Sequence, residues 1–82
     1  MSNNISILRM EKIEDLKQIS VTLRINEYES VYVLNVFDDD GILGLDIGID
    51  LQDLIIENSK KFIESVLGFY QGKAVSLPVN LG

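Results

Sequence analysis

The sequence of 82 residues contains no cysteine and no histidine. Without these residues the chain lacks thiolate nucleophiles, Ser-His-Asp and Cys-His arrangements, histidine general bases, and zinc sites built from nitrogen and sulfur ligands. It also lacks disulfides, which many small domains use to supplement a limited core. We therefore expect a protein that is not an enzyme and that uses no cofactor and no metal.

Long apolar runs are also missing. No stretch approaches the roughly 18 apolar residues of a membrane-spanning helix. The first 25 residues are unlike a secretory signal, because they carry seven charged side chains: Arg9, Glu11, Lys12, Glu14, Asp15, Lys17 and Arg24. We expect one small cytoplasmic domain over residues 1–82, with no membrane contact. A chain this short buries only about 60 to 65% of its unfolded surface, which makes oligomerisation a natural supplement.

Positive charge is absent from the middle of the chain. The formal net charge is −6, and residues 27–57 contain no lysine or arginine. The same stretch holds nine acids: Glu27, Glu29, Asp38, Asp39, Asp40, Asp46, Asp50, Asp53 and Glu57. An acidic balance argues against direct binding to nucleic acid or to anionic membranes. It favours a protein partner with a basic surface.

Three segments have the pattern of strands. Residues 19–26 and 42–49 alternate apolar with small or polar side chains, and residues 31–38 are rich in β-branched and aromatic types. Asp40-Gly41 between two apolar runs predicts a two-residue hairpin turn. This turn places Asn35 opposite Asp46, Leu34 opposite Ile47 and Tyr32 opposite Ile49. A four-residue loop over residues 27–30 would place Ile25 opposite Tyr32. In these registers one face of the meander is entirely apolar.

A long helix is predicted over residues 51–71, with Asp50 as its N-cap and Gly72 just past its end. One apolar stripe contains Leu51, Leu54, Ile55, Phe62, Val66 and Phe69, and an adjoining stripe contains Ile56, Ile63, Leu67 and Tyr70. Together the stripes are wider than one sheet can cover. We therefore expect a homodimer with Ile56, Ile63 and Leu67 at its contact, unless a terminal segment covers these residues.

The terminal segments complete the predicted fold. Residues 75–81 alternate like a short strand, and Pro78 confines such a strand to an edge or a strand end. Near the N-terminus, residues 5–10 fit a strand, and residues 11–17 fit a short helix with Ile13 and Leu16 facing inward. The predicted fold class is α+β, a three-stranded antiparallel meander packed on one long helix with a short C-terminal strand.

The sequence fits neither a calcium-binding EF-hand loop nor a phosphate-binding loop. If Gly41 is aligned with the sixth position of a calcium-binding EF-hand loop, Asp38 and Asp40 fit ligand positions. Val36 and Ile47 then fall where ligands are required, so a solvated turn is the better interpretation. The glycines fit no phosphate-binding loop.

The outward face of the predicted sheet has Val33 opposite Gly48 and Phe37 opposite Gly44. These apolar side chains either cover the glycines or form a shallow docking shelf for a partner.

Two resemblances concern parts of the chain. The segment Ile-Ser-Ile-Leu-Arg-Met-Glu-Lys-Ile at residues 5–13 resembles the start of plasmid mobilisation relaxases, but the histidine that those enzymes need is absent. The Asp38-Asp39-Asp40-Gly41 hairpin, followed by an acid-capped helix and a strand, is similar in layout to small phage inhibitors of uracil-DNA glycosylase that mimic DNA. Neither resemblance assigns a family.

The leading hypothesis is a small acidic inhibitor or titrator of a basic macromolecule, such as a nucleic-acid-binding protein, encoded by a phage or mobile element. Its expected binding residues are Asp38, Asp39, Asp40, Asp46, Asp50, Asp53 and Glu57, with Phe37 and Val33 as apolar contacts. One alternative is a homodimer that binds a small molecule at its interface, which thermal stabilisation by metabolites or nucleotides would reveal. Another is an assembly subunit, which would form higher oligomers without a heterologous partner.

Overall fold

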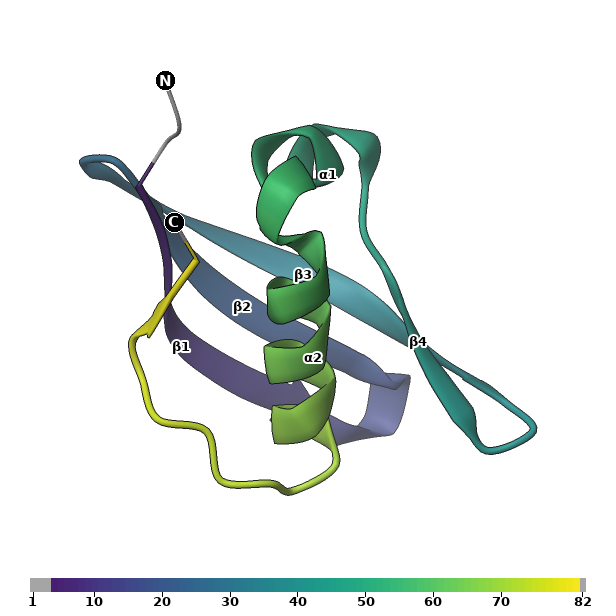
Figure 1. The fold of residues 1–82 in the computed structure, drawn as a ribbon. Helices are drawn as coiled ribbons and strands as arrows, with labels where there is room; N and C mark the ends of the chain where they lie inside the picture. Colours follow the sequence, from purple (N-terminus) through teal and green to yellow (C-terminus); the bar gives the residue numbers. More distant parts are fainter. Residues whose placement is uncertain (1–3, 82) are drawn as a thin grey trace.

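A computed structural model describes residues 4–81, apart from the side chain of Glu14, and has a mixed α+β fold (Figure 1). Five antiparallel strands form one curled sheet in the order β4-β3-β2-β1-β5. The strands are β1 (Ile5–Ile13), β2 (Gln18–Ile25), β3 (Tyr28–Asp39), β4 (Ile42–Asp46) and β5 (Val79–Asn80). Helix α2 (Ser59–Tyr70) packs on one face, after the shorter α1 (Ile49–Leu54). The predicted α+β class is confirmed.

The core lies between α2 and the strands at the middle of the sheet. Phe62 and Val66 of α2 are fully buried, and so are Ile19, Val21 and Leu23 of β2. No polar or charged residue is buried in the part of the chain that the structure describes. The strict alternation in β2 turns every second side chain to the helix, which is the pattern expected of a sheet with one covered face.

The turn between β2 and β3 is tighter than predicted. Asn26 and Glu27 alone form it, so Ile25 pairs with Tyr28 and not with Tyr32. Asn26 has a φ of 56°, a left-handed conformation that asparagine tolerates better than most residues. The register differs from the predicted one by four residues along β3. Since four is an even number, the same side chains still face the core.

The turn between β3 and β4 forms as predicted. Asp40 and Gly41 have φ values of 52° and 85°, and Asn35 pairs with Asp46. The ladder ends at that pair, so the predicted pairs Leu34–Ile47 and Tyr32–Ile49 do not form. The chain leaves the sheet after Asp46 and enters α1 at Ile49.

The prediction of a single long helix over residues 51–71 is wrong. The chain forms α1, a 3₁₀ turn η2 (Ile56–Asn58) and then α2. The break is at Ile55, whose φ of −108° and ψ of 14° are not helical. Neighbouring β-branched residues followed by Asn58 and Ser59 all have weak helix propensity, which accounts for its position. Asp50 is not the N-cap either, because Gly48 precedes α1 and Asp50 lies in its first turn.

The end of α2 follows the prediction. Gly72 has a φ of 89°. Its N–H donates to the Phe69 carbonyl at 3.0 Å, and the Lys73 N–H donates to the Gly68 carbonyl at 2.9 Å. These two bonds are those of a Schellman motif, in which glycine takes the left-handed position just past the helix.

The N-terminal helix predicted over residues 11–17 forms only as one short turn. β1 continues to Ile13, and only Glu14–Leu16 forms a 3₁₀ turn, η1. Leu16 was expected to face inward but is 64% exposed, while Ile13 is half-buried. A bulge between Ile7 and Arg9 shifts the alternation of β1, which explains why Met10 is buried.

The C-terminal strand is shorter than predicted and lies at an edge, as predicted. Of residues 75–81, only Val79 and Asn80 form β5, which follows Pro78 and pairs with β1. Leu81 is buried just beyond it. Its N–H donates to the carbonyl of Ile5 at 2.7 Å.

Candidate functional site

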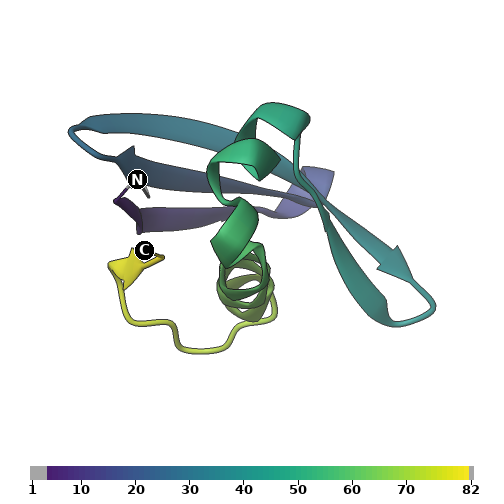
Figure 2. The ribbon, with the colours of Figure 1, turned by 45° about the horizontal axis from the view of Figure 1, so that its top comes forward.

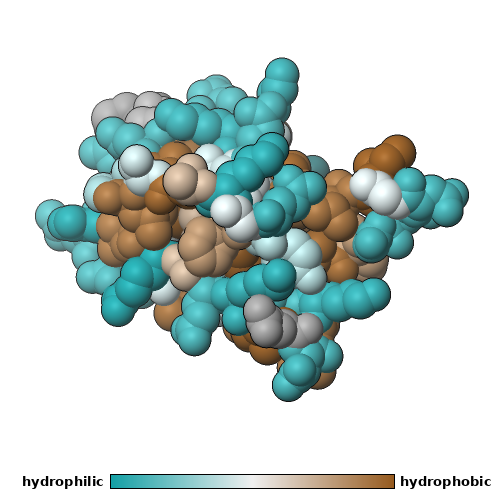
Figure 3. Space-filling model, turned by 90° about the horizontal axis from the view of Figure 1, so that it is seen from below, coloured by the Kyte–Doolittle hydropathy of each residue, from teal (hydrophilic) through white to brown (hydrophobic). Residues whose placement is uncertain are grey.

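The acids of residues 38–40 lie at the end of a hairpin arm, formed by the end of β3 and by β4. The arm projects from the body, and the space-filling view shows a hydrophilic end with hydrophobic side chains behind it (Figure 3). Asp38, Asp39 and Asp40 are all exposed. Asp38 has a structural role as well, because its carboxylate accepts the Gly41 N–H at 3.1 Å. The turn therefore presents three carboxylates to solvent.

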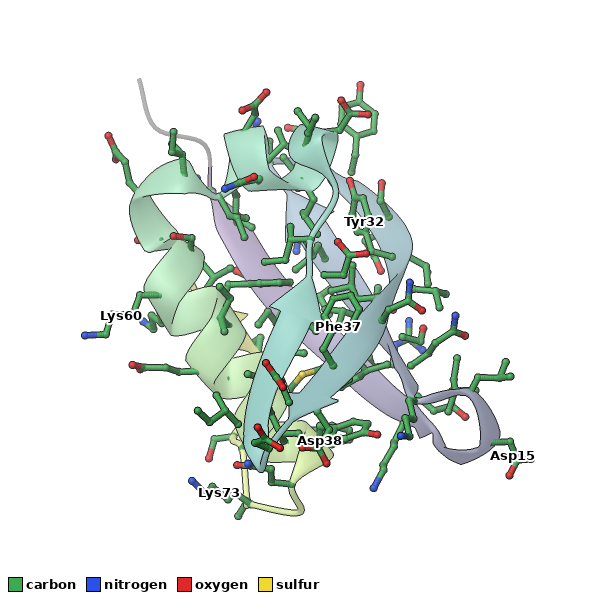
Figure 4. The ribbon with its side chains drawn as sticks, turned by 90° about the vertical axis from the view of Figure 1, so that its right-hand side faces the viewer. Asp15, Tyr32, Phe37, Asp38, Lys60 and Lys73 are labelled. Atoms are coloured by element: carbon green, nitrogen blue, oxygen red, sulfur yellow. The ribbon has the colours of Figure 1, made fainter. Side chains whose placement is uncertain are left out.

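The remaining predicted acids lie on three elements, α1, η2 and β4. Asp50 and Asp53 belong to α1, Glu57 belongs to η2, and all three are exposed. Asp46 ends β4 and is also exposed. Figure 4 views the molecule from the side on which β4 lies in front, with α1 above and the β3–β4 turn below. The acids thus extend along one side of the molecule rather than forming one compact cluster.

The acids on this side of the molecule form no ion pair with the bases that the structure describes. Among the side chains described between residues 4 and 81, no lysine or arginine lies within ion-pair distance of an aspartate or glutamate. Lys60 lies on α2, away from Phe37, whereas Lys73 lies at the same end of the molecule as Asp38 (Figure 4). Lys73 also lines a shallow depression together with Leu43 of β4. Because the acids are exposed and unpaired, their field extends into solvent and is limited mainly by the salt concentration.

Apolar side chains accompany the acids on the outer face of the sheet. Phe37 is 54% exposed and pairs with Gly44, where a Cβ would lie 4.0 Å from the Cβ of Phe37. The predicted Phe37–Gly44 pair is therefore present. Val33 is 55% exposed, but it does not pair with Gly48, because β4 has already ended. Sequence reasoning did not single out Ile42, which shares this face and is 75% exposed.

An open depression lies between β3 and the start of α1. It has a volume of about 590 Å³ and is lined mainly by apolar residues: Tyr32, Val33, Leu34, Gly48, Ile49, Asp50 and Leu51. The predicted pairing of Ile49 with Tyr32 would have filled this depression, but Ile49 is exposed instead. Gly48 is the one residue of the sequence that indicates this depression. Because glycine has no side chain to pack, it weakens a strand and favours an early end of β4.

The residues predicted at a dimer contact differ in exposure. Ile56 is 68% exposed. Ile63 and Leu67 are half-buried and pack against the core, and they share a shallow depression with Leu43 of β4. The curled arm therefore covers part of the second helix stripe, which the sequence analysis left without a cover. Tyr70 of the same stripe lies under the ammonium group of Lys12, 4.6 Å from the ring centre.

The described residues contain neither a metal-binding cluster nor a helix that could span a membrane. Within residues 4–81, no three acidic side chains converge closely enough to hold a metal ion. No helix in that range has the length and apolar character needed to cross a bilayer. Neither a protein-family model nor a curated protein matches this sequence.

Proposed function

We propose that this chain is a small, non-enzymatic binding protein that acts in the cytosol and inhibits or titrates a basic protein partner. The observation that carries the proposal is the set of nine exposed acids in residues 27–57, a stretch without a single base. Turn and cap chemistry explains some of these acids individually. It does not explain why no lysine or arginine accompanies them.

Two kinds of contact have separate roles in this proposal. The carboxylates of Asp38, Asp39 and Asp40 attract a basic surface over a distance of about 8 to 10 Å at physiological salt. Phe37 and Val33, exposed on the adjoining sheet face, then supply short-range apolar contact. Charged groups at the rim of an interface mainly raise the association rate, whereas desolvated apolar groups slow dissociation.

A nucleic-acid-binding protein is the proposed partner, because such proteins carry basic patches that match phosphate backbones. Exposed carboxylates on the hairpin arm satisfy the same patches. An inhibitor of this kind fits a phage or mobile element, where a small protein inactivates a host factor.

The test compares two variants of equal net charge. In the first, Asp38, Asp39 and Asp40 are changed to lysine. In the control, Glu11, Asp15 and Glu64, which lie on other elements, are changed to lysine. Each set of three substitutions adds six charges and brings the formal net charge from −6 to zero. Partners are captured on immobilised protein from a lysate of the source cell and identified by mass spectrometry.

We expect the wild type and the control to retain a basic partner that the arm variant loses. The association rate of the captured partner should fall steeply with added salt, and its dissociation rate should change less. Equal capture by the wild type and the arm variant would show that the three aspartates are only turn residues.

A further inference from the structure

Half of strand β3 has no neighbour on one side. β3 contains 12 residues, but β4 pairs only with residues 35–39 of it. Residues 28–34 pair with β2 on the other side and form an edge of the sheet. Figure 2 shows β3 as the outermost strand along this half, with α1 beyond its far end.

The outward hydrogen-bonding groups of this edge can be assigned from the turn. Ile25 and Tyr28 close a two-residue turn, so they form a hydrogen-bonded pair. Alternation along an antiparallel ladder then turns the N–H and C=O of Glu29, Val31 and Val33 away from β2. Within residues 4–81, these three residues have no other backbone partner. The edge therefore offers three donors and three acceptors in a row.

Apart from the charge of Glu29, this edge lacks the features that usually prevent strand addition. Lysine, proline and bulges are the common protective devices. Residues 28–34 contain neither lysine nor proline, and their register with β2 is continuous. Val31 is 63% exposed and Val33 is 55% exposed, so side chains do not shield the backbone.

The apolar depression adjoins the same edge. Val33 and Leu34 form one wall of it, and Ile49 and Leu51 form another. Its volume of about 590 Å³ is within the range of small ligand sites, which is enough for one or two apolar side chains. In an added strand, alternate side chains point to one face, so every second residue of the incoming segment would turn toward this depression.

Charge determines which chain fits this edge. Glu29 lies on the edge itself, and Asp50 lines the depression. The base-free stretch of residues 27–57 includes the whole edge, although Arg24 of β2 is the cross-strand partner of Glu29. A second copy of this chain would bring its own Glu29 and Asp50 against the first. A segment with lysine or arginine is therefore favoured over self-association.

We propose that the open edge of β3 binds an extended, basic segment of the partner protein as an additional strand. Backbone hydrogen bonds to Glu29, Val31 and Val33 hold the segment, its apolar side chains enter the depression, and its basic side chains face Glu29 and Asp50. This inference rests on the proposed function, which supplies the basic partner. It adds the mode of binding, which is strand addition.

The test uses two synthetic probes, a nine-residue peptide of alternating lysine and valine and a peptide of nine lysines. Val31→Pro removes one outward N–H and places a ring at the open edge, while the hydrogen bonds to β2 remain. Val31→Thr is the matched control, because it keeps both the N–H and the β-branched shape. Binding is measured by fluorescence anisotropy at low and at physiological salt.

We expect the lysine-valine peptide to bind the wild type and Val31→Thr alike, and to bind Val31→Pro at least about tenfold more weakly. The lysine-only peptide should bind all three proteins equally, through charge alone. Amide hydrogen exchange of wild-type Glu29, Val31 and Val33 should slow when the lysine-valine peptide is added. This last measurement needs no variant, and it decides the matter if Val31→Pro fails to fold.

Three results would overturn the inference in distinguishable ways. Equal binding of the lysine-valine peptide to the wild type and Val31→Pro, with unchanged exchange, would exclude strand addition and leave the acidic surface as the binding site. Failure of both peptides to bind the wild type would contradict the proposed function as well. If Val31→Pro converts a dimer to a monomer in light scattering without peptide, the edge is occupied by a second copy of this chain.

Discussion

The body of the sheet and the hairpin arm are built from similar sequence patterns but bury their residues to different extents. In β1 and β2 the inward residues near the middle of the sheet are completely covered, among them Ile7, Ile19 and Leu23. In β4 the inward residues Leu43 and Leu45 are only half-buried, and Ile42 is 75% exposed. Alternation sets which side a residue faces, whereas the extent of α2 sets how much of that side is covered. The body therefore supplies stability, and the arm supplies accessible surface.

The largest expected effect is on the body. Phe62→Ala removes a fully buried aromatic ring from the first half of α2. We expect the free energy of unfolding to fall by about 3 to 5 kcal/mol, which approaches the whole stability of a domain of this size. Urea denaturation followed by circular dichroism measures this loss. A loss below about 1 kcal/mol would mean that α2 does not pack on the sheet as described.

The corresponding change in the arm is smaller. Leu45→Ala removes an inward but half-buried side chain. We expect a loss of about 1 to 2 kcal/mol in the free energy of unfolding, since part of the side chain is already in water. The same denaturation experiment checks it. A loss as large as that of Phe62→Ala would remove the contrast between the two regions.

Two glycines of the arm should respond with opposite signs. Gly41 has a φ of 85°, so Gly41→Ala should cost about 1 kcal/mol in the free energy of unfolding. Gly44 lies in β4 and has room for a Cβ, so Gly44→Ala should stabilise by about 0.4 to 1 kcal/mol. Thermal melting of both variants measures the pair. Destabilisation by both would show that the arm tolerates no added methyl group on its outer face.

The triple change of Asp38, Asp39 and Asp40 to lysine should have a small effect on stability. All three side chains are exposed, but Asp38 accepts the Gly41 N–H and Asp40 has a φ of 52°, which aspartate tolerates better than lysine. We expect a loss of about 0.5 to 1 kcal/mol in the free energy of unfolding, measured by urea denaturation. A much larger loss would mean that these carboxylates hold the turn together and are not free to serve binding alone.

A related expectation concerns the homodimer, which stays a proposal. Of the three predicted contact residues, Ile56 is the one whose substitution should not disturb the core. Ile56→Asp should therefore convert a dimer to a monomer in light scattering while leaving the melting temperature of the monomer nearly unchanged. A wild type that is monomeric at tens of micromolar would exclude this contact.

The β3–β4 turn could be predicted from the chemistry of its own residues. The β2–β3 register and the break between the helices could not, because the apolar pattern is the same with and without them. Asp40-Gly41 specifies its own conformation, so the pair Asn35–Asp46 followed directly. The β2–β3 register was wrong by four residues, because face alternation cannot distinguish registers that differ by an even number. The helix break at Ile55 was hidden because the apolar stripe continues across it.

The candidate binding surface was predicted in part. The prediction that the aspartates are exposed is confirmed, since short carboxylates in turns are rarely buried. The open edge of β3 was not foreseen, because it depends on the four-residue register difference and on β4 ending at Asp46. Both are tertiary outcomes that no single segment of the sequence specifies.

The pairing of β5 with β1 joins two segments at opposite ends of the described chain. Ile7 pairs with Val79, and the Leu81 N–H bonds to the Ile5 carbonyl at 2.7 Å. A contact across almost the whole chain carries a large loop-closure entropy and is slow to form, whereas the hairpins β1–β2, β2–β3 and β3–β4 are local. The three hairpins should therefore assemble first, and the core should close only when residues 79–81 arrive. We therefore expect Leu81 to pack late in folding, and mutations there should slow refolding less than they accelerate unfolding.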